Sequence, residues 1–299
     1  MDYSEMQDAF FAPRPDAALK TGWDTPARRL RDAIEPLAAV SFWARPVYNE
    51  YATLGLDFLT GYVWSRSSVL GDAEPGDVAA TFGVFEPGAV AALLAGGRAA
   101  CSREQVREAA LRGSAEALRT VVGDDEHLAA TVQSLRDAAG CADLAGRPLF
   151  AGASSQPWPQ DPHAALWHAA TLLRECRGDS HLDACVAAGL SGLEANVLTE
   201  LWVGYEPLAY TGTRAWSPDA MAAAQDRLRA RGLLDGDQLS KAGRELRTGV
   251  ERATDLAMAP VVAALEDELE PVAARCDTWG ARLVELGWFP PDLYKRAAG

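Results

Sequence analysis

The stretch "DAMAAAQDRLRARGLLDGDQLSKAGRELRTGV", residues 219–250, decides the fold that we predict. Its first part is a helical pattern that ends at a glycine, and two short apolar segments then flank the Asp-Gly pair at 235–236. An Asp-Gly pair between apolar segments is the strongest short-range signal for a β-hairpin. Ser240 then caps a further helix over 241–258, which a proline stops. The stretch therefore predicts a helix, a hairpin and a second helix.

Three helix starts precede or open this stretch. Ser180 with Asp183, and Ser191 with Glu194, have the three-residue spacing of a capping box. Ser217, followed by proline, marks the third start. Three helices, a hairpin and a helix follow one another in the order of a winged helix, with the hairpin as its wing.

The rest of the chain extends this unit in both directions. Apolar residues recur at three- and four-residue intervals before it, which is the period of helices packed on a core. We predict a mainly α fold in which a winged-helix-like unit packs on a helical N-terminal half. The predicted parts are a polar, irregular arm (1–26), the N-terminal half (27–140), a Gly-, Ser- and Pro-rich connector (141–163), the winged-helix-like unit (164–259) and a C-terminal helix with a tail (260–299).

The charge balance disfavours partners that carry negative charge. The 28 lysines and arginines are outnumbered by 42 aspartates and glutamates, which leaves a formal net charge of −14. A phosphate backbone repels such a chain unless its basic groups gather on one face. We therefore expect no nucleic-acid partner.

The sequence predicts neither a membrane segment nor a metal site. No apolar run approaches the roughly 20 residues of a membrane-spanning helix, and the acidic, proline-containing start is unlike a secretory signal. The five cysteines include no CxxC pair, and the four histidines form no HExxH motif. We expect a cytoplasmic protein with reduced thiols, no membrane contact, no bound metal and no cofactor.

Several segments resemble a known family. The longest are "PWPQDPHAALWHAATLLRECRGDSHLDACVAAGLSGLEANVL" (157–198) and "RLRARGLLDGDQLSKAGRELRTGVERATDLAMAP" (227–260). The segments "GYVWSRSSVLG" (61–71), "AATFGVF" (79–85) and "AGRPLF" (145–150) match its pattern too. The chain resembles a family of actinobacterial helix-turn-helix-like proteins that are distantly similar to MarR regulators.

This resemblance implies a fold and a conserved junction near residues 171–190, and it implies no particular reaction. In the family pattern the position of Cys176 is usually histidine and that of Met221 often tryptophan. If the family histidine contacts a ligand, the cysteine in this chain alters that contact.

The junction "TLLRECRGDSHLDACVAAGL" (171–190) supplies the candidate site. We predict that one helix stops near 176 and that His181 lies in the first turn of the next, where backbone N–H groups favour an anion. Arg174 and Arg177 would converge there on a carboxylate or a phosphate. Alternatively, these charges pair with neighbouring carboxylates as surface ion pairs, and His181 faces solvent. Asp179 with His181 is the candidate acid/base pair.

Aromatic residues before and within the junction predict the apolar wall of this pocket. An aromatic run is more often part of a core, but ligand pockets combine an apolar lining with a few converging polar groups. The predicted ligand-binding residues are Tyr48, Tyr62, Arg66, Phe82, Phe85, Trp167, His168, Arg174, Arg177 and His181.

A DNA-binding surface is less well supported by the residues. The third helix would enter the major groove, but its arginines, Arg227, Arg229 and Arg231, all lie at its C-terminal end. The wing carries Asp235 and Asp237, which a phosphate backbone repels.

We therefore predict a small-molecule-binding protein, and an enzyme of specialised metabolism is one kind of protein that fits this prediction. Its site would lie between the two halves and hold an anionic or polar group. The alternative is a ligand-responsive, MarR-like DNA-binding regulator that forms a homodimer through its terminal helices.

Overall fold

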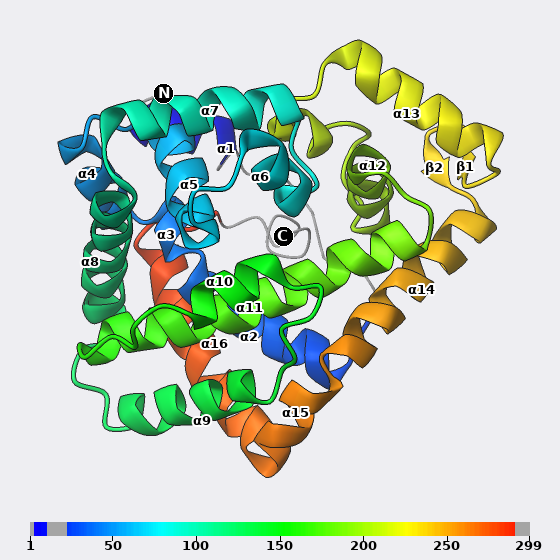
Figure 1. The fold of residues 1–299 in the computed structure, drawn as a ribbon. Helices are drawn as coiled ribbons and strands as arrows, with labels where there is room; N and C mark the ends of the chain where they lie inside the picture. The colour runs from blue at the N-terminus through cyan, green and yellow to red at the C-terminus, as the bar shows by residue number, and fades with distance from the viewer. Residues whose placement is uncertain (1–2, 11–22, 291–299) are drawn as a thin grey trace.

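The structure is a computed structural model that describes residues 3–10 and 23–290, and over these ranges it is mainly helical (Figure 1). The only sheet in the described ranges is the two-stranded hairpin β1 (Leu234–Asp235) and β2 (Gln238–Leu239). The predicted mainly α fold, with a winged-helix-like unit on a helical N-terminal half, is confirmed. None of the described helices is long and apolar enough to cross a membrane.

Asp161, which caps the helix that contains the junction, divides the helices into two groups. Those before it are α1 (Tyr3–Phe10), α2 (Pro26–Ala38), α3 (Val40–Trp43), α4 (Arg45–Thr53), α5 (Phe58–Ser67), α6 (Pro75–Phe82), α7 (Pro87–Ala100), α8 (Arg103–Val122), α9 (Leu128–Gly140) and α10 (Pro148–Ser154), with the 3-10 turn η1 (Ser68–Leu70). Those that follow are α11 (Pro162–Ala187), α12 (Gly192–Trp202), α13 (Pro218–Ala230), α14 (Lys241–Ala257), α15 (Ala259–Leu265) and α16 (Leu269–Glu285), with the 3-10 turns η2 (Thr211–Arg214) and η3 (Glu266–Glu268).

The larger hydrophobic core lies among α2 to α10, the first part of α11, and α15 and α16. Helix α2 begins at Pro26, and its buried stripe of Leu30, Ile34 and Leu37 faces α11 and α16. Helices α4 and α8 pack backbone to backbone, because a Cβ at Gly113 would lie 2.5 Å from the Cα of Val47. A close approach of this kind requires glycine.

The winged-helix-like unit has its own smaller core, made by the end of α11, α12, α13, the hairpin and α14. Its helix starts follow the prediction at three places. Ser191 and Glu194 form a complete capping box, and the side chains of Ser217 and Ser240 cap α13 and α14. Each cap satisfies backbone N–H groups that have no partner within the first turn.

The wing is shifted by one residue from the expected turn. Leu234 pairs with Leu239 and Asp235 with Gln238, so the two central residues of the turn are Gly236 and Asp237. Gly236 has φ +58°, and glycine at the first central position suits a two-residue hairpin turn.

Helix α11 is continuous from Pro162 to Ala187, so the predicted break before His181 is wrong. Ser180 does not cap a helix; its Oγ donates to the carbonyl of Cys176, 2.7 Å away, in the preceding turn. Serine inside a helix often bonds backward in this way. The charged residues after position 173 find partners on neighbouring elements, and the helix therefore continues through them.

Three further expectations need correction. Residues 3–10 of the arm form α1 where irregular backbone was expected; the remainder up to 22 lies outside the described residues, as does the tail from 291. The connector contains α10, which begins at a proline, where the missing N–H is tolerated. The final helix is divided, because Pro271 cannot donate to the carbonyl four residues earlier and is accommodated in the first turn of α16.

Helices α15 and α16 return to the larger core after the winged-helix-like unit (Figure 1). Trp279 is 1% exposed, and its Nε1 donates to Asp125 Oδ2 at 3.0 Å. The larger core is therefore built from both ends of the described chain, while the smaller core is continuous in sequence.

Candidate ligand-binding site

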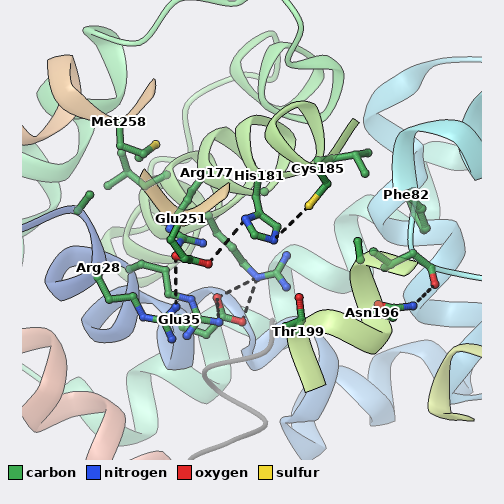
Figure 2. A pocket seen from close by; sticks show the side chains of 18 of the residues that line it. Arg28, Glu35, Phe82, Arg177, His181, Cys185, Asn196, Thr199, Glu251 and Met258 are labelled. Carbon is green, nitrogen blue, oxygen red and sulfur yellow. Dashed lines mark hydrogen bonds and ion pairs between the residues drawn. The ribbon is translucent and has the colours of Figure 1, made fainter. Parts of the chain in front are cut away.

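A cavity of about 140 Å³ lies where the winged-helix-like unit meets the N-terminal half (Figure 2). Helices α2, α5 and α6 line it on one side, and α11, α12 and α14 line it on the other. The two sides are joined closely, because a Cβ at Gly192 would lie 1.7 Å from the carbonyl oxygen of Gly83. Asn196 Nδ2 donates to the carbonyl of Val84 in the same turn, at 2.7 Å.

Glu251, from α14, is the centre of the first group of charges in the cavity wall. Its carboxylate lies 2.8 Å from Arg177 Nη2, 2.7 Å from Arg247 Nη1 and 3.9 Å from Arg28 Nη1. Glu251 is 1% exposed. Burial alone would raise the pKa of Glu251, but the guanidiniums of Arg247 and Arg177 outweigh burial and hold this pKa well below its usual value.

A second group joins α5, α11 and α2. Arg66 binds Glu175 through two nitrogens, at 3.0 and 2.7 Å, and Arg174 Nη1 lies 3.0 Å from the same carboxylate. Arg174 Nε also lies 3.3 Å from Glu35. Such paired geometry is the strong form of an arginine–carboxylate contact. The Arg66 guanidinium stacks over Phe82, 4.6 Å from the ring centre.

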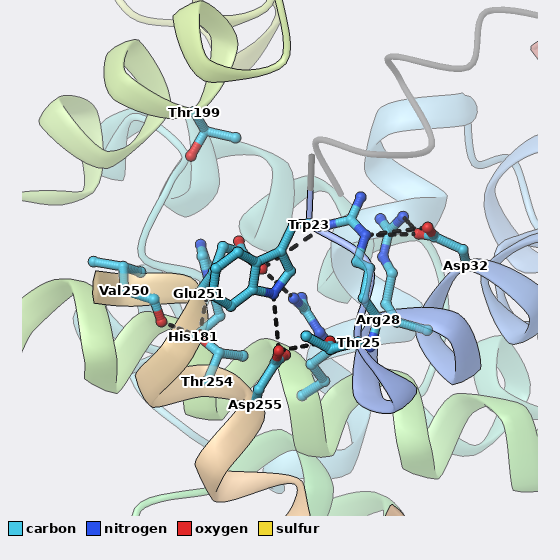
Figure 3. Close-up of polar contacts among 12 residues, drawn as sticks. Trp23, Thr25, Arg28, Asp32, His181, Thr199, Val250, Glu251, Thr254 and Asp255 are labelled. Atoms are coloured by element: carbon cyan, nitrogen blue, oxygen red, sulfur yellow. Dashed lines mark hydrogen bonds and ion pairs between the residues drawn. The ribbon is translucent and has the colours of Figure 1, made fainter. Parts of the chain in front are cut away.

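His181 is held as a neutral imidazole between α11 and α14 (Figures 2 and 3). The hydroxyl of Thr254 donates to the carbonyl of Val250 at 2.9 Å. The hydroxyl oxygen therefore accepts from Nδ1 of the imidazole, 3.1 Å away. Cys185 Sγ lies 3.7 Å from Nε2. Burial first, and the guanidinium of Arg247 second, lower the pKa of His181 to about 3.

The segment before α2 is fastened to α14 beside this cluster (Figure 3). Trp23 Nε1 and Thr25 Oγ1 both donate to Asp255 Oδ2, at 2.8 and 2.7 Å. Thr25 Oγ1 also accepts from the backbone N–H of Arg28 and so caps α2. One threonine therefore connects the start of α2 to the helix that carries Glu251.

Positive charge exceeds negative charge around the cavity. Seven arginines line the cavity, and two of them, Arg28 and Arg31, have Asp32 as a partner on α2. Around the other five, the carboxylates within 4.0 Å among the described residues are Glu35, Glu175 and Glu251. The five are Arg66, Arg174, Arg177, Arg214 and Arg247. In a chain of net charge −14, this local excess favours a ligand with negative charge.

Arg214 accounts for much of that excess, since it has no carboxylate within 4.0 Å in the part of the chain that the structure describes. Its guanidinium lies over the rings of Phe85 and Tyr210, 4.9 and 4.3 Å from their centres. Its Nε is buried and has no hydrogen-bond partner among the described residues. Thr213 Oγ1 accepts from Nη1 at 3.2 Å.

Glu200, fully buried in α12, positions the turn that carries Arg214. Its carboxylate accepts from the backbone N–H groups of Leu208, Tyr210 and Thr211, at 2.6 to 3.2 Å. Burial raises the pKa of Glu200 in spite of these bonds. The turn η2 is thus fixed to the unit's core by one side chain.

Of the predicted ligand-binding residues, the structure brings seven together in this cavity: Tyr62, Arg66, Phe82, Phe85, Arg174, Arg177 and His181. Trp167 and His168 line a second cavity on the other side of Arg66 and Arg174. Tyr48, in α4, is half-buried and lines neither cavity. That any of these residues binds a ligand stays a prediction.

The structure does not bring Asp179 and His181 together. Asp179 Oδ2 accepts from the backbone N–H of Phe150 at 3.0 Å, on the α10 side of α11, whereas His181 faces α14. Burial and the neighbouring Glu175 raise the pKa of Asp179 to about 7, against the opposing bond from Phe150. The alternative prediction of surface ion pairs is wrong for Arg177, because this arginine pairs with Glu251 in the interior.

Cys176 lies in the larger core and lines neither cavity. Its Sγ lies 3.8 Å from the sulfur of Met258. No group of three or more potential metal ligands among His, Cys, Asp and Glu occurs within the described ranges.

Arg247, Glu251 and Arg214 were not predicted from the sequence as site residues. A signal for the first two existed, because Gly243, Arg247, Val250, Glu251 and Thr254 form one helical stripe in α14 that is buried throughout. An ionic pair inside a stripe of small and apolar residues indicates interior charge. Arg214 had no such signal, since its turn follows no periodic pattern.

The C-terminal end of α13 presents arginines that already have partners. Arg227 lies 3.1 Å from Glu194, and Arg229 lies 2.8 Å from Asp226 and 2.9 Å from Asp237 in the wing. Arg231 donates to the carbonyl of Gly189. These contacts lower the positive charge that the helix offers to a phosphate backbone.

Comparison with known proteins places the whole fold in one family. A family model described as a helix-turn-helix family matches residues 27–290, which is most of the chain. Comparison with curated proteins and with solved structures gives no match. The match includes both the helical N-terminal half and the winged-helix-like unit, and the chain belongs to this helix-turn-helix family.

Proposed function

We propose that this protein binds a small molecule with a carboxylate or phosphate group in the cavity between its two halves. The observation that carries the proposal is the excess of guanidiniums in the cavity wall: four arginines share Glu35, Glu175 and Glu251, and Arg214 has no carboxylate within 4.0 Å among the described residues. A bound anion would offset the excess charge where little water screens it. Each charge-assisted hydrogen bond to the ligand would contribute about 1.5–3 kcal/mol.

The expected ligand also has an apolar part. Tyr62, Phe82 and Phe85 form one aromatic group beside the arginines, with ring centres 5.8 to 6.3 Å apart. An aromatic or branched apolar group would lie against these rings, while Arg214 and Arg177 hold the anion. His181, which is neutral, would form part of the cavity wall and would add no charge.

Native mass spectrometry of the purified protein tests this proposal by identifying a co-purified anionic ligand. Arg214→Gln should weaken binding of that ligand about tenfold or more, because one charge-assisted bond is lost. Arg231→Gln, on the exposed end of α13, is the matched control and should bind normally. Equal affinity in both variants would contradict the proposed site.

Arg177→Ala should also weaken binding about tenfold or more. This variant removes a partner of Glu251 as well, so its folding must be checked first. Arg214 is therefore the cleaner position for the measurement.

A second candidate is a ligand-responsive DNA-binding regulator, and family membership favours it more directly than it favours an enzyme. Helix α13 has the place of the recognition helix, before the wing. A gel shift on the protein's own upstream DNA at physiological salt tests this candidate. A nanomolar, salt-sensitive shift that the ligand reverses would establish it, whereas no shift would leave ligand binding alone.

A homodimer would accompany the regulator, because two-fold symmetric operators are read by dimers. The apolar face of α16 is already buried in the larger core through Val272, Cys276 and Trp279. A dimer formed through this terminal helix would therefore use its outer, polar face. Light scattering during size-exclusion chromatography measures the mass directly.

A further inference from the structure

A second cavity, of about 220 Å³, lies among α5, α8, α10 and the first part of α11. Its deepest lining is apolar and small, with Ala38, Ala110, Leu149 and Ala153 all buried. The indole of Trp167 covers one side, and its Nε1 already donates to the carbonyl of Ala38 at 3.1 Å. This part of the wall thus offers contact area and little polarity.

The charges around this second cavity balance, unlike those of the first. Three arginines and three glutamates line it: Arg66, Arg107, Arg174, Glu104, Glu108 and Glu175. Arg66, Arg174 and Glu175 bind one another and form the partition between the two cavities. Glu104 and Glu108 are exposed, at the rim. A ligand with net charge therefore gains no attraction here.

One hydrogen-bonding group in the interior is unused. Thr171 Oγ1 is buried and has no hydrogen-bond partner among the residues that the structure describes. The nearby Ser41 and Ser68 hydroxyls donate to the carbonyls of Ala38 and Ser65. A buried hydroxyl without a partner is costly, and a ligand that bonds it removes that cost.

His168 adds no charge to the interior. Burial, followed by the guanidiniums of Arg107 and Arg136, lowers its pKa to about 4, so the imidazole is neutral at physiological pH. Its ring meets that of Trp158 edge-on, with 5.2 Å between ring centres.

We propose that the second cavity is a separate binding site for a neutral, mainly apolar small molecule that carries one hydroxyl or carbonyl group for Thr171. A dry apolar cavity of roughly 150 Å³ holds benzene, so this larger cavity accommodates a compound of two fused rings. The site is back to back with the anion site and shares Arg66 and Arg174 with it. The two ligands would differ in charge, because the two walls differ in charge.

The test measures binding of 2-naphthol, which is neutral at pH 7, and of 2-naphthoate, an anion of similar size, by titration calorimetry. We expect saturable binding of 2-naphthol at one site and at least tenfold weaker binding of 2-naphthoate to that site. Thr171→Val keeps the shape of the side chain and removes its hydroxyl. It should weaken 2-naphthol about three- to tenfold and leave naphthalene unaffected.

Ala153→Leu places extra carbon atoms in the cavity and should abolish binding of both neutral probes. If this variant fails to fold, Thr171→Val decides alone. Arg214→Gln changes a residue that lines the first cavity and not the second, and this variant should bind 2-naphthol as the unchanged chain does. This control separates failure of the second site from failure of the proposed anion site.

Three results would overturn the inference. They are no saturable 2-naphthol binding below about 1 mM, equal affinity for 2-naphthoate at the same site, and 2-naphthol affinity unchanged by Thr171→Val. A rise in melting temperature of Thr171→Val without ligand is expected in addition, because the variant buries one unpartnered hydroxyl fewer.

Discussion

The interior of the junction and the outer end of α13 carry the same kind of ion pair in different surroundings. Arg177 and Glu251 lie 2.8 Å apart with side chains 7% and 1% exposed, whereas Arg229 and Asp237 lie 2.9 Å apart and are 36% and 67% exposed. Exposed pairs contribute about 0–1 kcal/mol, because water competes with both partners. Loss of one partner in the interior leaves an uncompensated buried charge. Distance alone therefore says little about what a pair contributes.

The largest effect is expected from Glu251→Gln. The change leaves Arg177, Arg247 and Arg28 without the carboxylate that they share, and the free energy of unfolding should fall by about 3–5 kcal/mol. Urea unfolding at pH 7 measures the loss. Glu245→Gln on the same helix, whose contact with Lys241 is exposed, should change the free energy by less than about 0.5 kcal/mol. Equal losses at the two positions would remove the contrast between interior and surface.

Asp179→Asn should stabilise the protein, because this buried carboxylate has no ion-pair partner within 4.0 Å among the described residues. Its pKa of about 7 in the folded chain exceeds the roughly 4 of an unfolded aspartate, so between these values the folded state holds the extra proton. The free energy of unfolding then falls as pH rises through this window. The variant should gain about 2 kcal/mol at pH 8.

The asparagine oxygen still accepts from the N–H of Phe150. At pH 4 the variant and the unchanged chain should unfold alike, since the aspartate is then largely protonated. Thermal unfolding at both pH values measures the difference. A gain of equal size at pH 4 would point to a cause other than titration.

Thr25→Ala should lower the free energy of unfolding by about 1–2 kcal/mol. It removes the cap of α2 and one of the two bonds to Asp255. Ser217→Ala, at the exposed start of α13, removes a cap only and should lose about 0.5–1 kcal/mol. Chemical denaturation compares the two, and a larger loss at Ser217 would be inconsistent with a special role for the α2 contact.

The smallest effect is expected from Arg229→Ala on the free energy of unfolding. Its two carboxylate partners are exposed, so the change should stay within about 0.5 kcal/mol. Denaturation in low and in 1 M salt measures it, and the small difference should shrink in high salt. A loss of several kcal/mol would mean that the wing is held by this arginine.

The parts of the fold that could be predicted are those decided by residues close in sequence. The caps at Ser191, Ser217 and Ser240 and the hairpin depend on contacts over a few positions. Ser180 has the same spacing to an acidic residue as Ser191, but Arg147 and the surrounding core hold it inside α11. Local signals lose to packing where partners come from distant segments.

The candidate site was predicted in part for the same reason. Arg174, Arg177 and His181 share one helix, and their shared location could be expected from spacing. Their partners could not, since Glu35 lies 139 positions from Arg174 along the chain and Glu251 lies 74 positions from Arg177. The two cavities were therefore expected as one, because the partition between them consists of such long-range pairs.

The return of α15 and α16 to the larger core has a consequence for how the chain is made. During synthesis, α2 to α10 leave the ribosome before α11 to α16, and the surface that Val272 and Trp279 cover stays open until α16 emerges. The winged-helix-like unit is complete once α14 has emerged, and it can fold before the larger core is complete. Chaperones that shield apolar surface would then be needed for the older half of the nascent chain, and a message truncated after α14 would yield an aggregating product.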